Sequence, residues 1–333
     1  MNELSIVFTC DEGYILPTGI AIFSLFQSKC ENTSYKIYVL VDDLNIKYKE
    51  IIQSMDKPGF KIIIREIANI EKYTSLAKAN RLPVSALYKF SIPEMILEED
   101  ICLSLDGDIV VKRDLGSLTK INLDDYYAAV IKDSPKTIEE YTEEKHNKYP
   151  GIFNKDYFNG GVLLLNLKKM REDNIPEKLC EYRKKGYNQS FSMNQDTFNS
   201  VLYKHVRFLP FAYNTGMHVF RYIQTEEKFH RMKKYYEIDD YKSEEDILED
   251  AYIIHFSGKA KPWNYYDVFY ADRYRLLYFD SPFKNEKLNR KNYYNDKVRK
   301  RYTEIKESKD YVIGSLVLKI PRLVNNILKR VKH

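Results

Sequence analysis

The sequence predicts an α/β protein whose mainly parallel sheet is covered by helices on both faces. Short apolar runs rich in β-branched residues alternate with amphipathic segments from the N-terminus onward, which is typical of parallel strands joined by crossover helices. The chain has 333 residues, of which 44% are hydrophobic, so it can bury a sizeable core. No run reaches the ~20 apolar residues of a membrane-spanning helix.

The N-terminal part shows the clearest alternation. Residues 4–10 (LSIVFTC) form an apolar run that ends in the polar DEGY, which predicts a first strand and its loop. Residues 18–29 (TGIAIFSLFQSK) have helical spacing, with Thr18 as the candidate N-cap. The next elements are expected to be a strand, a helix and a strand over residues 35–43, 45–55 and 60–67.

The middle of the chain is less regular. Residues 101–111 (ICLSLDGDIVV) predict one further strand, although two carboxylates interrupt the apolar run. The remaining expectations are strands at 126–133 and 160–167, a helix or loop at 136–150, helices at 174–186 and 194–204, and a segment at 244–258 that ends a helix and enters a final strand.

The C-terminal part differs in composition. We place a boundary near residue 270, which divides the chain into a main domain (residues 1–270) and a mainly helical extension (residues 271–333). Between Ile313 and Val331, apolar residues follow a three-four spacing and basic residues lie largely off that stripe. Such a helix can lie on an anionic membrane surface. It can equally pack on the protein's own core or on a second subunit.

Charge and cysteine content narrow the class of protein. A formal net charge of +5 is only mildly basic, so no nucleic-acid partner is expected. The N-terminal MNELSIVFTC lacks the basic and long apolar regions of a signal peptide. Without a CxxC or other zinc spacing, the cysteines are expected to be reduced thiols of a cytoplasmic protein. They are Cys10, Cys30, Cys102 and Cys180.

Asp106 and Asp108 are the first candidates for chemistry. Burying a carboxylate is costly, so this pair needs a counter-ion, a metal or a proton. Residues two apart in a strand point to the same side, and open α/β sheets bind ligands at the carboxyl edge. Gly107 between them allows backbone to approach a ligand closely. Paired carboxylates suit Mg²⁺ or Mn²⁺, whereas the alternative is a capped turn at a strand end.

The segment YIIHFSGKAKPW is a second candidate. It puts His255 at the end of an apolar strand, followed by Gly258 and Lys261. An imidazole suits Mn²⁺ better than Mg²⁺, and a glycine turn followed by lysine suits a diphosphate. A lone histidine there is also compatible with an ordinary core or loop residue.

Two amide-rich segments complete the candidates. YFNGGVLLLN has Asn159 and a glycine pair entering a strand, and MNQDTFN has Asn194, Gln195 and Asp196 at a helix start. Amides and carboxylates match the donor and acceptor faces of sugar hydroxyls. For Asn194 the alternative is helix capping.

Six segments in this order resemble glycosyltransferase family 8, which includes bacterial lipo-oligosaccharide galactosyltransferases and the glycogenins. They are IVFTCDEGY, SALYKFSIPEMI, CLSLDGDIVV, YFNGGVLLLNLKKMR, NQDTFN and IHFSGKAKPW, and the resemblance spans roughly residues 4–263. It implies a GT-A fold, in which a Rossmann-like, mixed but mainly parallel sheet has helices on both faces. Residues 1–270 would then be the catalytic domain.

The resemblance also implies an activity. The family transfers a sugar, with retention of configuration, from a nucleotide-sugar bound with Mn²⁺, for which Mg²⁺ is the alternative. The expected donor is a UDP-sugar, with UDP-galactose or UDP-glucose favoured. The expected acceptor is an oligosaccharide or a lipid-linked glycan in cell-surface polysaccharide synthesis. An anionic membrane surface is a further expected partner through the C-terminal helix, with a peripheral location on the inner face of the plasma membrane.

Residue roles follow from the same resemblance. Asp106, Asp108 and His255 match metal ligands. Gln195 matches the residue beside the anomeric carbon, with Asn194 and Asp196 next to it. The positions that match UDP-sugar contacts are Thr9, Cys10, Asp11, Tyr14, Lys89, Asp106, Gly107, Asp108, Asn159, Gly160, His255, Gly258 and Lys261.

Three positions depart from the family pattern. Gly13 stands where Asn is often found, and Lys259 replaces a common Pro. Asn194 replaces a frequent Asp, which leaves the donor-sugar preference open, since an amide can donate a hydrogen bond where a carboxylate only accepts.

The implied mechanism is departure of UDP from an anomeric carbon. Mn²⁺ would neutralise charge on the leaving diphosphate, and Lys89 and Lys261 would add fixed positive charge. A carboxamide at Gln195 is a poor nucleophile, which favours an oxocarbenium-like centre over a covalent sugar intermediate.

Two other functions stay open. One is a haloacid-dehalogenase-like phosphohydrolase that uses Asp106 as its nucleophile, which leaves IHFSGKAKPW unexplained. The other is a catalytically silent carbohydrate-binding relative, which the three intact metal positions disfavour.

Overall fold

The computed structural model of the protein describes residues 2–80, 83–134, 143–149, 151–185, 193–288 and 291. The chain forms two compact units, each described here by itself. The first comprises Met1–Gly258 and Leu277–Glu286, and the second Lys259–Leu276 and Lys287–His333. The division near residue 270 stays a prediction. The amphipathic segment at 313–331 lies outside the described residues.

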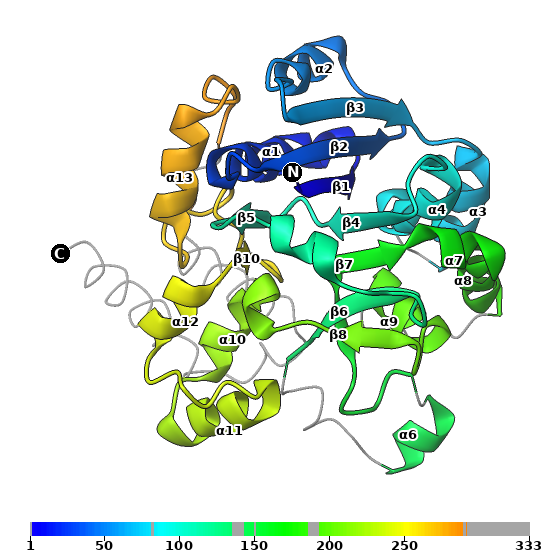
Figure 1. The fold of residues 1–333 in the computed structure, drawn as a ribbon, viewed down its shortest axis with the longest axis vertical. Helices are drawn as coiled ribbons and strands as arrows, with labels where there is room; N and C mark the ends of the chain where they lie inside the picture. Colours follow the sequence, from blue (N-terminus) through cyan, green and yellow to red (C-terminus); the bar gives the residue numbers. More distant parts are fainter. Residues whose placement is uncertain are drawn as a thin grey trace, which may run out of the picture. The chain divides into compact units, whose positions relative to one another are not determined.

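A mixed sheet forms the centre of the first unit (Figure 1). Within the described residues it has seven strands, in the order β3-β2-β1-β4-β7-β6-β8. All neighbouring pairs are parallel except β4 with β7 and β6 with β7. The strands are β1 (Asn2–Thr9), β2 (Thr33–Val41), β3 (Phe60–Glu66), β4 (Ile101–Leu105), β6 (Ala128–Lys132), β7 (Phe158–Asn166) and β8 (Val206–Phe208). The predicted mixed, mainly parallel sheet is therefore confirmed.

Helices alternate with these strands along the chain. The α-helices are α1 (Ile15–Ser28), α2 (Ile46–Gln53), α3 (Ile70–Asn80), α4 (Ile92–Met95), α6 (Glu143–Lys148), α7 (Leu167–Glu172), α8 (Ile175–Lys184), α9 (Met193–Val201), α10 (Met217–Tyr222), α11 (Glu226–Tyr236), α12 (Glu244–Asp250) and α13 (Ala271–Asp280). The 3-10 helices are η1 (Glu12–Tyr14), η2 (Val84–Ser91), η3 (Gly116–Lys120) and η4 (Phe211–Asn214). Among the described residues, no helix is both long enough and apolar enough to cross a membrane.

Both faces of the sheet are buried. On one face, Val7 and Tyr38 belong to a core cluster that also contains buried side chains of α3, η2, α4, α7, α8 and α9. Because side chains alternate along a strand, Ile6 and Phe8 point to the other face, and both are fully buried. Such two-sided burial explains why β1 reads as a continuous apolar run and not as an alternating one.

Residues 101–111 do not form the single strand that was predicted. They divide into β4 and β5 (Ile109–Val111), and the aspartates lie in the turn between them. β5 belongs to a separate sheet of order β5-β10-β9, with β10 at Ile253–His255 and β9 at Thr215–Gly216. Gly107 makes this turn compatible with α1, since a Cβ there would lie 2.2 Å from Thr18 Oγ1.

The predicted N-cap at Thr18 is also wrong. Helix α1 begins at Ile15, and the Thr18 hydroxyl donates a hydrogen bond of 2.8 Å to the Tyr14 carbonyl inside the helix. The short strands β8 and β9 were not predicted, because three and two residues are too few to show a period.

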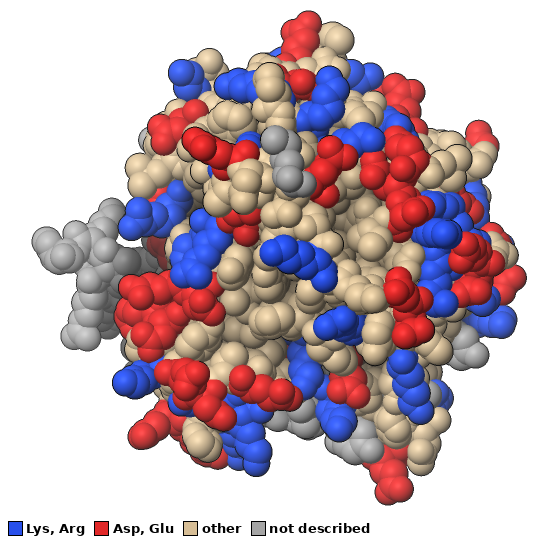
Figure 2. Space-filling view, viewed as in Figure 1, with Lys and Arg blue, Asp and Glu red and all other residues tan. Residues whose placement is uncertain are grey.

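Charged side chains of both signs intermingle on the molecular face in Figure 2. Among the described residues on this face, lysines and arginines form no continuous basic surface. The absence of a nucleic-acid partner stays a prediction.

Glu98 gives the fold a pH-dependent contribution. It accepts hydrogen bonds from Arg65 Nη1 at 3.2 Å and from the Tyr38 hydroxyl at 2.9 Å. The Arg65 guanidinium, which also contacts the glutamate through Nη2, lowers the pKa of Glu98 from 4.5 to about 2. Because the folded-state pKa is depressed, the stabilisation is complete above about pH 4.5 and is lost as the pH falls toward about 2.

Glu98→Gln should therefore lower the free energy of unfolding at pH 7 by about 1 kcal/mol, the upper range for partly exposed ion pairs. The difference from wild type should shrink progressively below about pH 4.5. Urea unfolding at a series of pH values measures it. Glu66→Gln is the matched control, because Glu66 pairs with Lys49 at 3.3 Å on the exposed surface. A Glu98→Gln effect that is the same at every pH would contradict the assignment.

Candidate active site

Asp106, Asp108 and His255 come together at the carboxyl edge of the central sheet. His255 Nε2 lies 3.3 Å from Asp108 Oδ1 and 3.7 Å from Asp106 Oδ2. One ligand atom from each residue lies within 4.8 Å of the others. The pairing of β10 with β5 explains this, since the Phe256 N–H donates to the Asp108 carbonyl at 2.9 Å.

The donor set fits a small divalent cation. Ligand atoms on adjacent corners of an octahedron lie about 3 Å apart when the metal–oxygen bonds are about 2.1 Å. The 3.3 Å distance from His255 Nε2 to Asp108 Oδ1 is close to that spacing, and the 3.7 Å distance to Asp106 Oδ2 is longer. His255 is 4% exposed and Asp108 is 8% exposed, so their polar atoms have little access to bulk water.

Gly161 provides the space for this cluster. A Cβ at this position would lie 2.3 Å from His255 Cε1 and 2.8 Å from Asp106 Oδ2. Its carbonyl accepts the Asp106 N–H at 2.8 Å. Of this glycine pair, only Gly160 was predicted to contact the UDP-sugar. The doubled glycine inside an apolar strand was itself a signal that another segment approaches the backbone closely.

Lys89 lies beside the acidic cluster and is almost fully buried. Its ammonium is 2.7 Å from Asp106 Oδ1 and donates to the Gly160 carbonyl at 2.6 Å. A buried lysine needs such partners to remain charged. With Asp106 Oδ1 bound by Lys89, Asp106 Oδ2 faces His255.

The Asp133 carboxylate, which was not predicted to be a site residue, accepts hydrogen bonds from two side-chain amides. Asn159 Nδ2 donates to Asp133 Oδ1 and Gln195 Nε2 donates to Asp133 Oδ2, each at 3.1 Å. Asp133 follows β6, which runs parallel to β4 because both are antiparallel to β7. Asp133 and Asp106 are thus at the same edge of the sheet. An acidic residue at the end of the predicted strand 126–133 was the available signal.

The first turn of α9 contains the three residues that were predicted to be catalytic. Gln195 Oε1 accepts the Gly160 N–H at 2.8 Å, so both ends of this amide are bound. Asp196 is buried and accepts the Tyr157 hydroxyl at 2.5 Å. Burial and the Asp196 charge raise the pKa of Tyr157 well above its usual value. Asn194 is half-buried at the helix start.

The residues predicted to bind the nucleotide follow β1 at the same edge. Thr9 ends the strand, and the Cys10 N–H donates to the Leu40 carbonyl at 3.1 Å. Burial raises the pKa of the Cys10 thiol to about 12, so the thiol is protonated at neutral pH. Asp11 accepts the Tyr14 N–H at 3.1 Å and caps η1.

Two predicted diphosphate contacts lie beyond β10. Gly258 has a φ of 89°, a left-handed conformation that favours glycine. Lys261 belongs to the second unit, where its Nζ lies 5.6 Å from the centre of the Trp263 ring. The assigned role of Lys261 stays a prediction.

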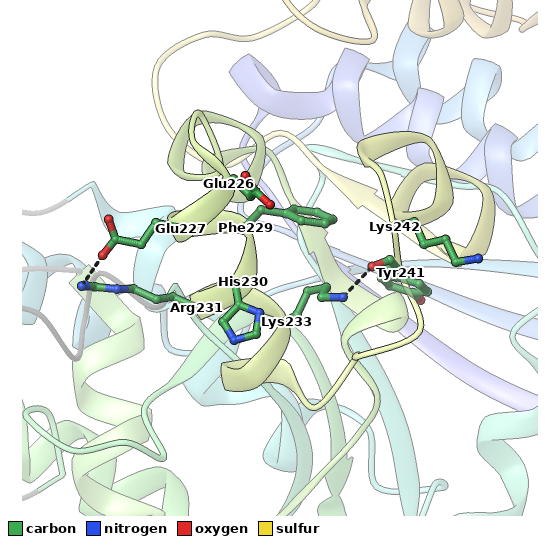
Figure 3. A pocket seen from close by; sticks show the side chains of 8 residues that line it. All are labelled: Glu226, Glu227, Phe229, His230, Arg231, Lys233, Tyr241 and Lys242. Carbon is green, nitrogen blue, oxygen red and sulfur yellow. Dashed lines mark hydrogen bonds and ion pairs between the residues drawn. The ribbon is translucent and has the colours of Figure 1, made fainter.

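A hollow of about 730 Å³ lies elsewhere in the first unit, on α11 and the loop after it (Figure 3). Two of its cations have partners in the same segment. Arg231 pairs with Glu227 at 2.7 Å, and Lys233 donates to the Tyr241 carbonyl at 2.9 Å. None of the predicted site residues lines this hollow.

Comparisons with known proteins agree on the class of protein. The family model described as glycosyl transferase family 8 matches residues 5–267. A lipopolysaccharide 1,2-glucosyltransferase of Escherichia coli is 27% identical, over 83% of this chain and 78% of the relative. A lipopolysaccharide 1,3-galactosyltransferase of Salmonella typhimurium is 22% identical, over 83% and 77%. The crystal structure of galactosyltransferase LgtC with donor and acceptor sugar analogues superposes with a TM-score of 0.68 at 21% identity, over 84% and 96%.

Gly161→Ala should weaken divalent-cation binding by about 10-fold or more, a typical cost when metal ligands lose their orientation. The added methyl group would displace His255 or Asp106. Calorimetric titration with Mn²⁺ in the presence of UDP measures the affinity. Gly160→Ala is the matched control, because its Cβ would lie 3.3 Å from Gln195 Cβ and away from the acidic cluster. Equal Mn²⁺ affinity in the two variants would contradict the steric argument.

Proposed function

The chain belongs to glycosyltransferase family 8, and from that premise we propose that it transfers a hexose from a UDP-sugar to a glycan acceptor with the help of a divalent cation. The chain is a glycosyltransferase with the α/β GT-A architecture. The observation that carries the finer proposal is the convergence of Asp106, Asp108 and His255 at the sheet edge. UDP-glucose and UDP-galactose are the favoured donors, since two relatives are named as a glucosyltransferase and a galactosyltransferase.

Asp106, Asp108 and His255 would hold the cation. An imidazole among the ligands favours Mn²⁺ over Mg²⁺. When bound, such a cation supplies Lewis-acid stabilisation of the negative charge on a leaving diphosphate. Because only three protein ligands are offered among the described residues, further coordination positions would be open to the donor.

Fixed protein charges would orient the metal ligands, and side-chain amides would bind the donor sugar. The buried Lys89 ammonium holds Asp106 Oδ1, so the carboxylate orientation is set before the donor arrives. Asp133 and the amides of Asn159 and Gln195 form a hydrogen-bonded group whose donors and acceptors match sugar hydroxyls. Preorganised polar groups of this kind stabilise developing charge without reorganisation during the reaction.

Gln195 supports transfer with retention of configuration through same-face attack. Its amide oxygen accepts the Gly160 N–H and its nitrogen donates to Asp133. An amide engaged at both ends is unsuited to forming a covalent sugar intermediate. Its dipole is instead available to stabilise an oxocarbenium-like anomeric centre.

The geometry also bears on the phosphohydrolase alternative. One Asp106 oxygen is bound by Lys89 and the other faces His255. A nucleophilic aspartate would direct this second oxygen at a phosphorus atom, whereas here Asp106 belongs to a group of three potential metal ligands. The contacts of Asp106 therefore favour a metal-holding role.

The acceptor is proposed from the names of two relatives. An oligosaccharide or lipid-linked glycan of the cell surface fits the relatives' names. A cytoplasmic location and a peripheral contact with the inner face of the plasma membrane stay predictions. The segment proposed for that contact lies outside the described residues.

A panel of UDP-sugars tests the proposal without an acceptor. The wild-type protein should release UDP slowly from one donor in the presence of Mn²⁺. Asp108→Asn should lower this rate by about 10²–10³-fold, the usual cost of losing one electrostatic contact to the transition state. Asp125→Asn, the same charge change at the opposite end of β6, is the matched control and should leave the rate unchanged.

Three outcomes would contradict the proposal. Absence of both Mn²⁺-dependent UDP binding and UDP release would reject it. Tight binding of UDP and Mn²⁺ without turnover of any donor would favour the silent carbohydrate-binding relative. Hydrolysis of simple phosphate esters that Asp106→Asn abolishes, with UDP binding intact, would favour the phosphohydrolase.

A further inference from the structure

Asn214 connects the metal-ligand cluster to the sugar-side amides. It ends η4 and is directly followed by β9, which pairs with β10, the strand of His255. Its side chain is 4% exposed. His255 Nδ1 lies 3.0 Å from Asn214 Oδ1, and Asn214 Nδ2 donates to Asn159 Oδ1 at 2.9 Å. A buried side-chain amide must form hydrogen bonds through both its oxygen and its nitrogen.

The direction of these hydrogen bonds can be deduced from Asn159. Its Oδ1 accepts the Gly161 backbone N–H at 2.9 Å, and its Nδ2 donates to the Asp133 carboxylate at 3.1 Å. A backbone N–H can only donate, and an ionised carboxylate can only accept. The reversed amide would put two donors together at Gly161 and two acceptors together at Asp133. The orientation of Asn159 is therefore determined.

The orientation of Asn159 in turn determines that of Asn214. The group of Asn214 that faces Asn159 Oδ1 must be the donating NH₂. Its oxygen then faces His255 Nδ1 and has no proton to give. His255 Nδ1 must carry the proton and donate it.

The proton on Nδ1 determines which ring nitrogen of His255 is available on the side of the carboxylates. A proton on Nδ1 leaves Nε2 as the ring nitrogen whose lone pair a neutral imidazole can offer to a metal. Nε2 lies 3.3 Å from Asp108 Oδ1 and 3.7 Å from Asp106 Oδ2, so all three atoms are within reach of one cation. Asp106, Asp108 and His255 would each offer one ligand atom to a divalent cation held there.

We propose that Asn214 is a positioning residue that holds His255 as the Nδ1-protonated tautomer and thereby presents Nε2 as a metal ligand. The inference rests on the metal site of the proposed function. Hydrogen bonds to the second nitrogen of a ligating histidine fix its tautomer and ring orientation, and their loss typically lowers metal affinity about 10–100-fold.

Two Asn214 variants separate orientation from simple packing. Asn214→Leu removes the acceptor for His255 and should weaken Mn²⁺ binding in the presence of UDP about 10–100-fold. Asn214→Asp keeps an acceptor for the Nδ1 proton but loses the donor to Asn159, so it should bind Mn²⁺ about 10-fold more tightly than Asn214→Leu. Asn199→Leu is the matched control, because Asn199 is a buried amide that bonds Phe158 and Gln195. It should lower thermal stability and leave Mn²⁺ affinity unchanged.

The tautomer can be read directly. Long-range ¹⁵N–¹H correlation spectra of histidine-labelled protein with Mg²⁺ and UDP should show His255 protonated at Nδ1 and unprotonated at Nε2. Comparison with a His255→Asn variant assigns the signal. Asn214→Leu should lose this single tautomeric pattern, and Asn214→Asp should retain it.

The possible results test the role of Asn214 and the proposed metal site separately. Equal Mn²⁺ affinity of wild type and Asn214→Leu, or a wild-type proton on Nε2, would overturn the role of Asn214 while the proposed function stands. Absence of Mn²⁺ binding by the wild type would overturn the metal site of the proposed function and this inference with it. If Asn214→Leu fails to fold, the wild-type spectrum and the Asn214→Asp variant still test the role of Asn214.

Discussion

Buried negative charge at the carboxyl edge of the central sheet is the constraint on which the rest of the site depends. Asp108 and His255 are both nearly inaccessible to water, and burying a carboxylate there is costly unless another charge compensates it. Lys89 offsets part of this charge through its contact with Asp106. In the proposed metal site, a cation held by Asp106, Asp108 and His255 would offset the remaining negative charge.

Chain direction brings the site together. Parallel strands β1, β4 and β6 all end at this edge, while β7 runs antiparallel and therefore begins there. As a result, Asn159 at the start of β7 meets Asp133 at the end of β6. The separate sheet of β5, β10 and β9 then brings His255 and Asn214 to the same place. The amides of Asn159, Gln195 and Asn214 thus form one connected hydrogen-bonded group with His255, a proposed metal ligand.

Part of the fold could be predicted because buried parallel strands have continuous apolar runs. Residues 4–10, 35–43 and 60–67 match β1, β2 and β3 closely. The single strand at 101–111 was wrong, since its apolar flanks gave no sign that they belong to two different sheets. That division is set by strand pairing between distant segments, since β4 pairs with β1 and β7 while β5 pairs with β10.

The sequence by itself determined which ligand chemistry the chain offers: two carboxylates, an imidazole and a set of amides, in an order that resembles a known family. Residue identity and order are sufficient for that, because they limit which groups are available to a cation or a sugar. Only the tertiary structure decided the roles of Gly161, Asp133 and Asn214. Each depends on which side chain of a distant segment lies within about 3 Å, the range of a hydrogen bond, and strand pairing sets this distance.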